Sequence, residues 1–438
     1  VKWRYGGEVW VLSNLASQQT LFRTFDGLSK IAGDPKYRHA AVNAIAYAFE
    51  NLRSDNGLLY WGGHLVYDAR TDKVCMFTDS GYADIHELKY HFPYYELMWE
   101  VNPEATRTFI ESFWSAHIMD WSNLDMNRHG STREHLSSPW EHEYKGGPVF
   151  FISRGLSFSN TGSDLFYAGS MLYNLSGQRE PLVWSKRLAH RYIETRNPKV
   201  GISGGQYSRL QRDRAQLQFG DDFKGHLVLE GTLFPYSPRS ITLASQVRGW
   251  ICQLMLGDLL GPDGKEFSQW SSDELAAWGK IAYRKRDNSF IPMLTDGTRL
   301  EGYVDTKGGY FGPAGTVVKA IPAPLIALWA YALAYRVTED EFMWEMARNI
   351  AQGHNLGDIG KTAMDELHLE TTTKCSCPYV LLAFLELYEK TAKKAFLEMA
   401  SRIGDNIILD RFHKGFFVPK KGCIYTQFNY VEPLALLH

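Results

Sequence analysis

Three neighbouring side chains carry the groups that an enzyme needs to bind a carboxylate. Asn127, Arg128 and His129 supply an amide, a guanidinium and an imidazole, shortly after the aromatic segment 109–121. A guanidinium binds a carboxylate through two parallel hydrogen bonds, and the amide and imidazole can add further donors. A helix C-terminus decorated with cations would show the same residue types. We predict that these three residues neutralise a substrate carboxylate.

Two tyrosines lie in a glycine-rich stretch near an arginine. Tyr303 and Tyr310 follow Arg299 and are flanked by glycines. A phenol with an ordinary pKa near 10 is a poor base, so a nearby cation must lower its pKa. Packed loop tyrosines would give the same pattern. We predict that the tyrosines transfer protons and that Arg299 contacts the substrate.

Further residues are candidates for substrate binding. They are aromatic rings beside glycines, polar side chains of loops, an acid in an apolar run, and two polar residues at the start of the helix expected at 85–100: Trp61, His64, Tyr207, Arg209, Glu230, His86 and Glu87. Each also has a structural explanation, as a packed turn, a solvated charged loop or a paired buried acid.

Several other chemistries are excluded by spacing. His86 and His91 are five residues apart, whereas the zinc helix H-E-x-x-H needs four. The string Gly201–Gly205 matches G-x-S-x-G, but we expect neither a strand before its serine nor a helix after it. Cys375 and Cys377 do not form the C-x2-C pairs of a zinc site. We therefore expect no catalytic metal and no required cofactor, although the loops leave room for a structural divalent cation.

The elements that must position these residues are mostly helices. Asn102-Pro103-Glu104 is a typical helix start, and apolar residues then recur every three to four positions. Similar periodicity predicts helices at roughly 36–52, 85–100, 165–176, 180–196, 240–258, 272–285, 322–337, 340–353, 376–389 and 391–407. Short strands are expected at 9–12, 73–77, 149–152 and 226–229.

Long irregular stretches separate these helices at 53–84, 122–164, 198–238 and 286–321. The pattern predicts an all-α fold, an (α/α) toroid of about six to seven helical hairpins that forms one domain over residues 1–438. Long loops and a few short strands would build the site at one mouth.

Composition limits the partners. The 438 residues include 47 Lys and Arg against 49 Asp and Glu, a formal net charge of −2, so there is no basic footprint for nucleic acid. No run of 18 apolar residues occurs, so we expect no membrane span. A local cationic cleft can still attract a polyanion. We expect a monomer.

Four motifs together resemble those of α/α-toroid polysaccharide lyases. They are Tyr60–His64, His86–Glu96, Phe113–Ile118 and Asp120–Gly130. The chain is most similar to polysaccharide lyase family 38, whose members cleave alginate or glucuronan. The resemblance implies a barrel of about seven hairpins, β-elimination chemistry and secreted or periplasmic action. It also implies that an asparagine and a histidine, here Asn127 and His129, neutralise the carboxylate or remove the proton, and that a tyrosine acts as acid or base.

The residues and the resemblance predict a lyase that cleaves a 1,4-linked uronic-acid polymer, alginate or glucuronan. Donors around the carboxylate stabilise the charge that develops when the C5 proton leaves, and a Tyr or His takes that proton. One alternative is a toroid glycoside hydrolase that uses Asp125, Glu87 or Glu230 as its acid. Another is a glycan-binding protein with Trp61, Trp121 and Tyr207 as stacking platforms.

Overall fold

The computed structural model of the protein describes residues 2–5, 8–60, 65–76, 85–88, 92–131, 138–149, 151–153, 155–209, 214–223, 243–309, 312–423 and 426–438. Within these residues, six pairs of consecutive helices form antiparallel hairpins. They are α1 (Gln19–Ala32) with α2 (Lys36–Asn51), α3 (Tyr95–Val101) with α4 (Pro103–His117), α5 (Ser159–Ser176) with α6 (Arg179–Ile193), α8 (Leu243–Leu260) with α9 (Lys265–Ile281), α10 (Leu325–Thr338) with α11 (Glu341–Gly353), and α12 (Pro378–Thr391) with α13 (Lys394–Arg411).

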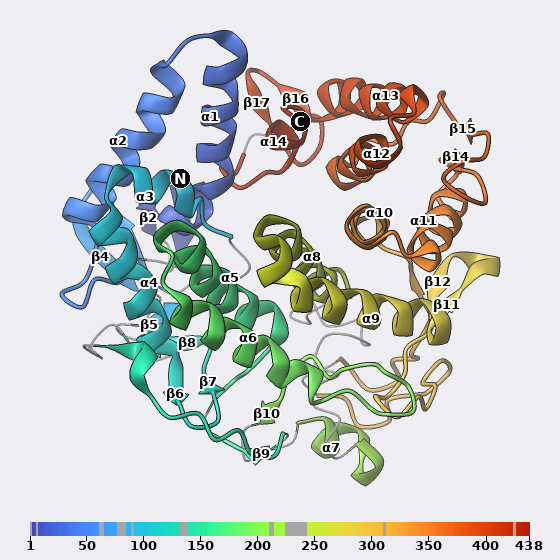
Figure 1. Ribbon diagram of the computed structural model, residues 1–438, viewed down its shortest axis with the longest axis horizontal. Coiled ribbons are helices and arrows are strands. Elements are labelled where there is room, and N and C mark those ends of the chain that lie inside the picture. The colour runs from blue at the N-terminus through green and yellow to red at the C-terminus, as the bar shows by residue number, and fades with distance from the viewer. Residues whose placement is uncertain are drawn as a thin grey trace.

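The hairpins are arranged in a closed ring (Figure 1). Helices α5, α8, α10 and α12 pack against one another in this order on the inside, and their partners α6, α9, α11 and α13 lie outside. The short helix α14 (Glu432–Ala435) contacts both α1 and α12, so the end of the chain closes the ring onto its beginning. The predicted all-α toroid is confirmed.

Local sequence explains where these helices begin and end. The Asn102 side chain accepts a hydrogen bond from the Ala105 amide at 2.9 Å, and Pro103 occupies the first turn of α4 as predicted. Gly33 and Gly177 end α1 and α5 in the left-handed conformation. Because the glycines end the helices abruptly, the turns between the paired helices are short.

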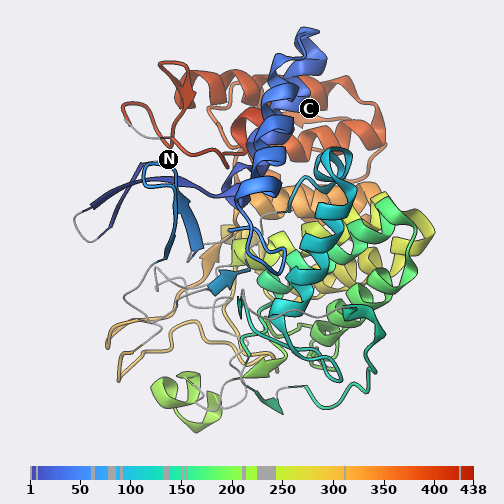
Figure 2. The same ribbon diagram turned by 90° about the vertical axis from the view of Figure 1, so that its left-hand side faces the viewer.

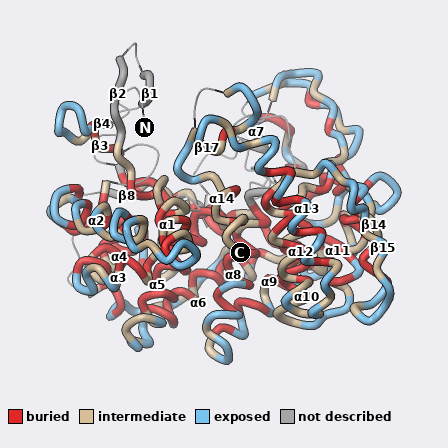
Figure 3. Tube along the Cα trace, turned by 90° about the horizontal axis from the view of Figure 1, so that it is seen from above, coloured by how far each residue is buried: buried red, intermediate tan, exposed pale blue. Residues whose placement is uncertain are grey.

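All the long connections lie at one end of the ring. They join the C-terminus of each outer helix to the N-terminus of the next inner helix, whereas the hairpin turns lie at the opposite end. Figure 2 shows the molecule from the side, and Figure 3 shows strands β3 (Leu65–Asp68), β4 (Lys73–Met76), β8 (His129–Ser131) and β17 (Phe416–Phe417) and the short helix α7 (Arg214–Phe219) on this side of the helices. The predicted site residues that the structure describes all belong to such connections, which puts these candidates at one mouth of the ring.

The strands are short; two precede α1, and the others lie in the segments that follow α2, α4, α6, α9, α11 and α13. One antiparallel sheet has the order β1-β2-β3-β4. Its strands are β1 (Lys2–Tyr5), β2 (Glu8–Ser13), β3 (Leu65–Asp68) and β4 (Lys73–Met76). The remaining strands form pairs and one set of three: β5 (Ile85–Glu87) with β8 (His129–Ser131), β6 (Ile118–Asp120) with β7 (Asp125–Met126), β9 (Phe151–Ile152) with β10 (Ser208–Arg209), β11 (Tyr283–Arg284) with β12 (Ser289–Phe290) and β13 (Ile321–Pro322), β14 (Gly357–Asp358) with β15 (His368–Leu369), and β16 (Phe412–His413) with β17 (Phe416–Phe417).

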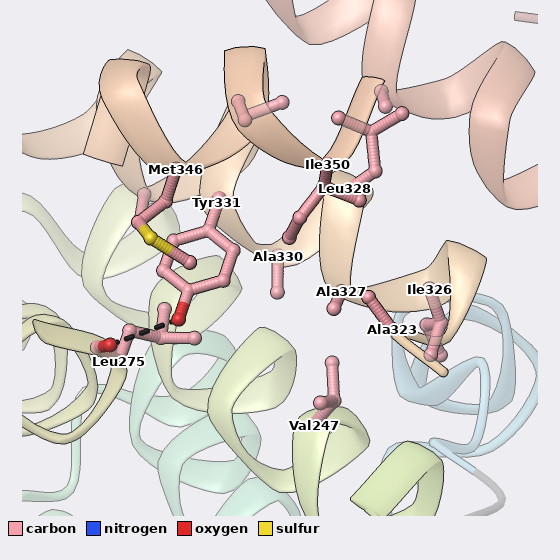
Figure 4. Close-up of a cluster of buried hydrophobic side chains, with 14 of the residues drawn as sticks. Val247, Leu275, Ala323, Ile326, Ala327, Leu328, Ala330, Tyr331, Met346 and Ile350 are labelled. Carbon is pink, nitrogen blue, oxygen red and sulfur yellow. Dashed lines mark hydrogen bonds between the residues drawn. The ribbon is translucent and has the colours of Figure 1, made fainter. Parts of the chain in front are cut away.

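Two clusters of buried apolar side chains support the ring. One extends from Leu15 to Phe267 and the other from Val200 to Ala435, and helices α8 and α9 contribute to both. In the second cluster the buried Tyr331 donates a hydrogen bond to the Leu275 carbonyl at 2.9 Å, which links α10 to α9 (Figure 4). The polar end of this tyrosine is therefore satisfied inside an apolar core.

Some predicted elements differ from the structure. Residues 85–87 form β5 rather than the start of a helix, and α3 begins only at Tyr95. Helix α1 was not predicted, and the strand expected at 226–229 lies outside the described residues. None of the described helices is long and apolar enough to cross a membrane.

Candidate active site

The strand pair β5–β8 brings two distant predicted segments together. In its register Glu87 lies opposite His129, and His86 lies opposite Gly130. Glu87 Oε1 is 3.9 Å from His129 Nε2, and both side chains are largely buried, with exposed fractions of 4% and 12%. A Cβ at Gly130 would lie 2.7 Å from the Ala116 carbonyl oxygen, so only glycine lets β8 lie this close to the end of α4. A buried carboxylate therefore faces an imidazole across two short strands.

A chain of hydrogen bonds holds β5 against the end of α4. His86 Nδ1 is 2.8 Å from His117 Nε2, and His117 Nδ1 is 2.7 Å from the Asn127 carbonyl oxygen. Burial lowers the pKa of His117 to about 3, so its ring is neutral at ordinary pH. Because a carbonyl can only accept, His117 carries its proton on Nδ1, and His86 donates from Nδ1 to His117. His117 thus orients His86 and Asn127 through two hydrogen bonds.

The backbone of Asn127–His129 is held from several sides. Asn127 donates to the His117 carbonyl at 2.9 Å, and its side-chain oxygen accepts from the His129 amide at 3.1 Å. Arg128 donates its amide to the Leu156 carbonyl at 3.3 Å, and its own carbonyl accepts from Leu88 at 2.8 Å. The three predicted residues are therefore fixed by α4, by the β5 segment and by the chain that leads into α5.

The Arg128 side chain retains unused hydrogen-bonding capacity. Its Nε is buried and has no hydrogen-bond partner among the described residues, and its guanidinium carbon is 6.0 Å from the centre of the Phe158 ring. A buried donor without a partner costs free energy, and a bound carboxylate would supply the missing acceptor. Arg128 therefore has a buried donor that a carboxylate could satisfy.

Tyr207 lies in the wall behind this cluster. It is fully buried, donates its hydroxyl to the Leu124 carbonyl, and packs edge-on against Tyr192 with ring centres 5.0 Å apart. Burial raises the pKa of Tyr207 well above its usual value. A ring with no open face gives little support to substrate stacking. Arg209 follows in β10, and its side chain lies outside the described part of the structure.

Tyr303 and Arg299 lie in a different connection, between α9 and α10. Tyr303 donates to the Phe219 carbonyl at 3.3 Å and contacts the rings of Phe219 and Phe223, with centres 6.0 and 5.3 Å away. Arg299 is exposed in a turn bridged to Met293. The contacts described for both residues are local to this connection, α7 and η4 (Asp221–Phe223), and none joins them to β5 or β8. Their catalytic and binding roles stay predictions.

Comparison with known proteins identifies the family. Residues 1–438 match the family described as periplasmic pectate lyase. The chain is also 30% identical over 462 aligned residues to a pectate disaccharide-lyase of Dickeya dadantii (strain 3937), covering 100% of this chain and 81% of that protein. The chain belongs to the periplasmic pectate lyase family. It is therefore a polysaccharide lyase, as predicted, although the matching family is not family 38.

Solved structures similar to this pectate lyase family member are more remote. One is a D-mannose isomerase, 15% identical, with a TM-score of 0.46 and coverage of 93% of this chain and 91% of that one. Another is a sugar epimerase from a ruminal bacterium, 13% identical, with a TM-score of 0.48 and coverage of 90% and 97%. At this level of similarity neither structure bears on the reaction.

Four predicted residues lie outside the described residues of this family member: Trp61, His64, Glu230 and Tyr310. Conversely, His117 was not among the predicted site residues. It lies within the motif Phe113–Ile118, but a histidine in the last turn of a helix is already explained by the helix dipole, so its type and spacing did not point to the site.

Metal binding has limited support in the described part of this pectate lyase family member. No group of three or more His, Cys, Asp and Glu side chains able to hold an ion occurs among the described residues. Glu87 and His129 are the candidates to supply two ligands, because a carboxylate oxygen and an imidazole nitrogen 3.9 Å apart can share one divalent cation. A third ligand would have to come from water, substrate or residues outside the described set.

A separate pocket between the α5/α6 and α8/α9 hairpins has a structural acid. Glu274 accepts from the Ser203 amide and hydroxyl, both at 2.9 Å, and from Arg196 Nε at 2.9 Å. The glutamate is thus saturated with donors. None of the predicted site residues lines this pocket.

Proposed function

We propose that this member of the periplasmic pectate lyase family cleaves pectate, a 1,4-linked polymer of galacturonate, by β-elimination. The observation that favours this site is the buried Nε of Arg128, which has no hydrogen-bond partner among the described residues and belongs to the residue next in sequence to His129 of the facing pair Glu87–His129. The family membership and the pectate disaccharide-lyase relative favour pectate over the alginate or glucuronan expected from the sequence. The periplasm is the proposed location, since the family is described as periplasmic.

The chemistry requires that charge be stabilised on the substrate carboxylate. Removal of the C5 proton leaves negative charge on C5, which is shared with the oxygens of the adjacent carboxylate. A guanidinium fixed beside those oxygens stabilises this charge and so lowers the activation barrier for proton removal. In this proposal Arg128 binds that carboxylate, and Asn127 holds the backbone amide of His129 so that the imidazole keeps its position. Loss of the C5 proton then breaks the C4–O4 bond and leaves a C4–C5 double bond, and the departing O4 takes a proton from water.

The residue that accepts the C5 proton is chosen from the catalytic residues predicted from the sequence. His129 is the titratable residue of the predicted catalytic set that lies beside Arg128, whereas the described contacts of Tyr303 are elsewhere. We therefore rank His129 ahead of Tyr303 as the acceptor of the C5 proton. Glu87 would stabilise the imidazolium that forms.

The test is ultraviolet absorbance during incubation with pectate, alginate, glucuronan and hyaluronan in parallel. Each β-elimination leaves a conjugated double bond, so absorbance should rise with pectate and much less with the other three polymers. A rise with alginate or glucuronan alone would contradict the proposed substrate. New reducing ends without absorbance would contradict the lyase reaction and indicate hydrolysis.

A further inference from the structure

The β16–β17 hairpin and the turn that follows it form a basic segment, which we call the hairpin region. Residues 411–422 contain Arg411, Lys414, Lys420 and Lys421 and no acidic residue, although the whole chain has a formal net charge of −2. Arg411 is engaged with the Pro419 carbonyl and lies 3.9 Å from Glu432. The three lysines are exposed, and the structure gives them no ion pair within the described residues. Their charges are therefore directed to solvent rather than used in folding.

Exposed aromatic rings accompany these charges. Phe416 is 60% exposed and Phe412 is 48% exposed. The register places Phe412 opposite Phe417, with ring centres 5.3 Å apart, and places Phe416 opposite His413 on the other face. Burying an apolar ring removes it from water and is favourable. A ligand that covers an exposed phenylalanine ring therefore gains binding free energy from that contact.

The tip of the hairpin holds a lysine in an unfavourable backbone conformation. Lys414 has φ +51° and Gly415 has φ +84°, which makes a two-residue turn with both residues left-handed. Glycine or asparagine would adopt the first position with less strain than lysine. Local folding therefore does not explain the choice of lysine at the tip.

The hairpin stands at the same mouth as the candidate active site. The outer helices end at the side of the ring that carries the long connections, and the hairpin directly follows the C-terminus of the outer helix α13. Figure 3 shows β17 on the same side as α7 and strands β3 and β4. Its base is fixed by a hydrogen bond from the Val418 amide to the Arg411 carbonyl at 2.8 Å. The charges and rings are thus held in a fixed place on the rim.

We propose that the hairpin region is a distal binding site for the acidic polysaccharide, separate from the point of cleavage. Lys414, Lys420 and Lys421 pair with uronate carboxylates along the polymer, and the Phe416 ring packs against the apolar C–H face of a sugar. This inference rests on the proposed function, because it takes an anionic polysaccharide as the ligand. Such a site binds ground state and transition state equally, so it lowers KM for long chains and leaves kcat unchanged.

The test compares the parent with the variant Lys414→Glu/Lys420→Glu/Lys421→Glu on polygalacturonate and on trigalacturonate. At low salt we expect KM for the polymer to rise about tenfold or more, because three attractions become repulsions, with kcat within about twofold. Kinetics on the trimer should not change, and added salt should reduce the difference. Phe416→Ala should raise KM for the polymer about threefold and retain the salt dependence of the parent.

A matched control separates local from net charge. Lys265→Glu/Lys394→Glu/Arg402→Glu alters net charge equally at exposed positions on the outer helices α9 and α13, and it should keep the parent KM. Equal KM values for the hairpin and control variants would overturn the proposal, as would an equal loss on the trimer. Electrophoresis in gels containing polygalacturonate measures binding without turnover. If the parent protein bound the polymer but never cleaved it, the proposed function would fail. The distal site would still be supported if only the hairpin variant lost its retardation in the gel. Unchanged retardation of the hairpin variant would refute the distal site.

Discussion

Two regions at the mouth of the ring were both expected to carry chemistry, and they differ in how their polar groups are used. Around β5 and β8, Glu87 and His129 come from different connections and face each other in a largely buried place, and Arg128, the residue before His129, has a buried Nε without a partner among the described residues. Between α9 and α10, Arg284 forms ion pairs with Asp287 and Glu301 on the surface, while Tyr303 packs on aromatic rings. A buried donor such as Arg128 Nε, with no partner among the described residues, indicates a site, whereas groups that satisfy one another locally indicate a folded loop.

Arg128→Lys is the substitution with the largest expected effect on this comparison. Lysine keeps the charge but lacks the planar guanidinium that holds a carboxylate through two bonds. We expect kcat on pectate to fall about 10²–10³-fold, with the thermal unfolding midpoint close to that of the parent. Retention of parent activity would mean that the unpartnered Nε does not serve the reaction.

Glu87→Gln tests the facing pair more selectively. The substitution keeps the shape of the side chain and removes the charge beside His129, so we expect kcat/KM on pectate to fall about 10–100-fold. Glu301→Gln is the matched control in the other region, where the carboxylate is exposed and bound to Arg284, and it should leave activity unchanged. If both variants lost activity equally, the contrast between the two regions would be wrong.

His117 predicts how stability depends on pH. Its pKa is lowered by burial to about 3 in the folded protein, so between about pH 3 and 6.5 the unfolded chain binds more protons and stability falls as pH falls. From pH 7 to pH 5 this histidine alone should reduce the free energy of unfolding by about 2 kcal/mol. His117→Gln should be less stable at pH 7 but should lose less on acidification, as urea unfolding at the two pH values would show. An identical loss in the variant would place the acid sensitivity elsewhere.

Tyr303→Phe has the smallest effect that the geometry predicts. The phenylalanine keeps the packing on Phe219 and Phe223 and loses one hydrogen bond, so kcat on pectate should change by less than about twofold. A general acid or base would instead lose about 10²–10⁴-fold. A loss of that size would support the role predicted from the sequence and remove the distinction between the two regions.

Much of the fold was predictable because its signals are local. Helix α4 was found from its Asn102 cap, its proline and its apolar period, which need no knowledge of the tertiary structure. Residues 85–87 were predicted as helix, because the extended conformation of so short a strand depends on pairing with β8, some 40 residues later.

The site was predictable in part for the same reason. The residue types of Asn127, Arg128 and His129 suggested carboxylate binding without any partner in view. The facing of Glu87 and His129, and the support from His117, are contacts between distant segments that spacing alone does not reveal. Tyr207 was chosen from its polar surroundings in the sequence, and only packing against Tyr192 shows that its ring is buried.

The most direct test of the central claim is the rate of ultraviolet absorbance increase on pectate for the parent and for Arg128→Ala, each shown to be folded by thermal unfolding. We expect a steady rise for the parent and a rate at least about a hundredfold lower for the variant, because the substrate carboxylate loses its guanidinium. No rise for the folded parent, or equal rates for the two proteins, would contradict it.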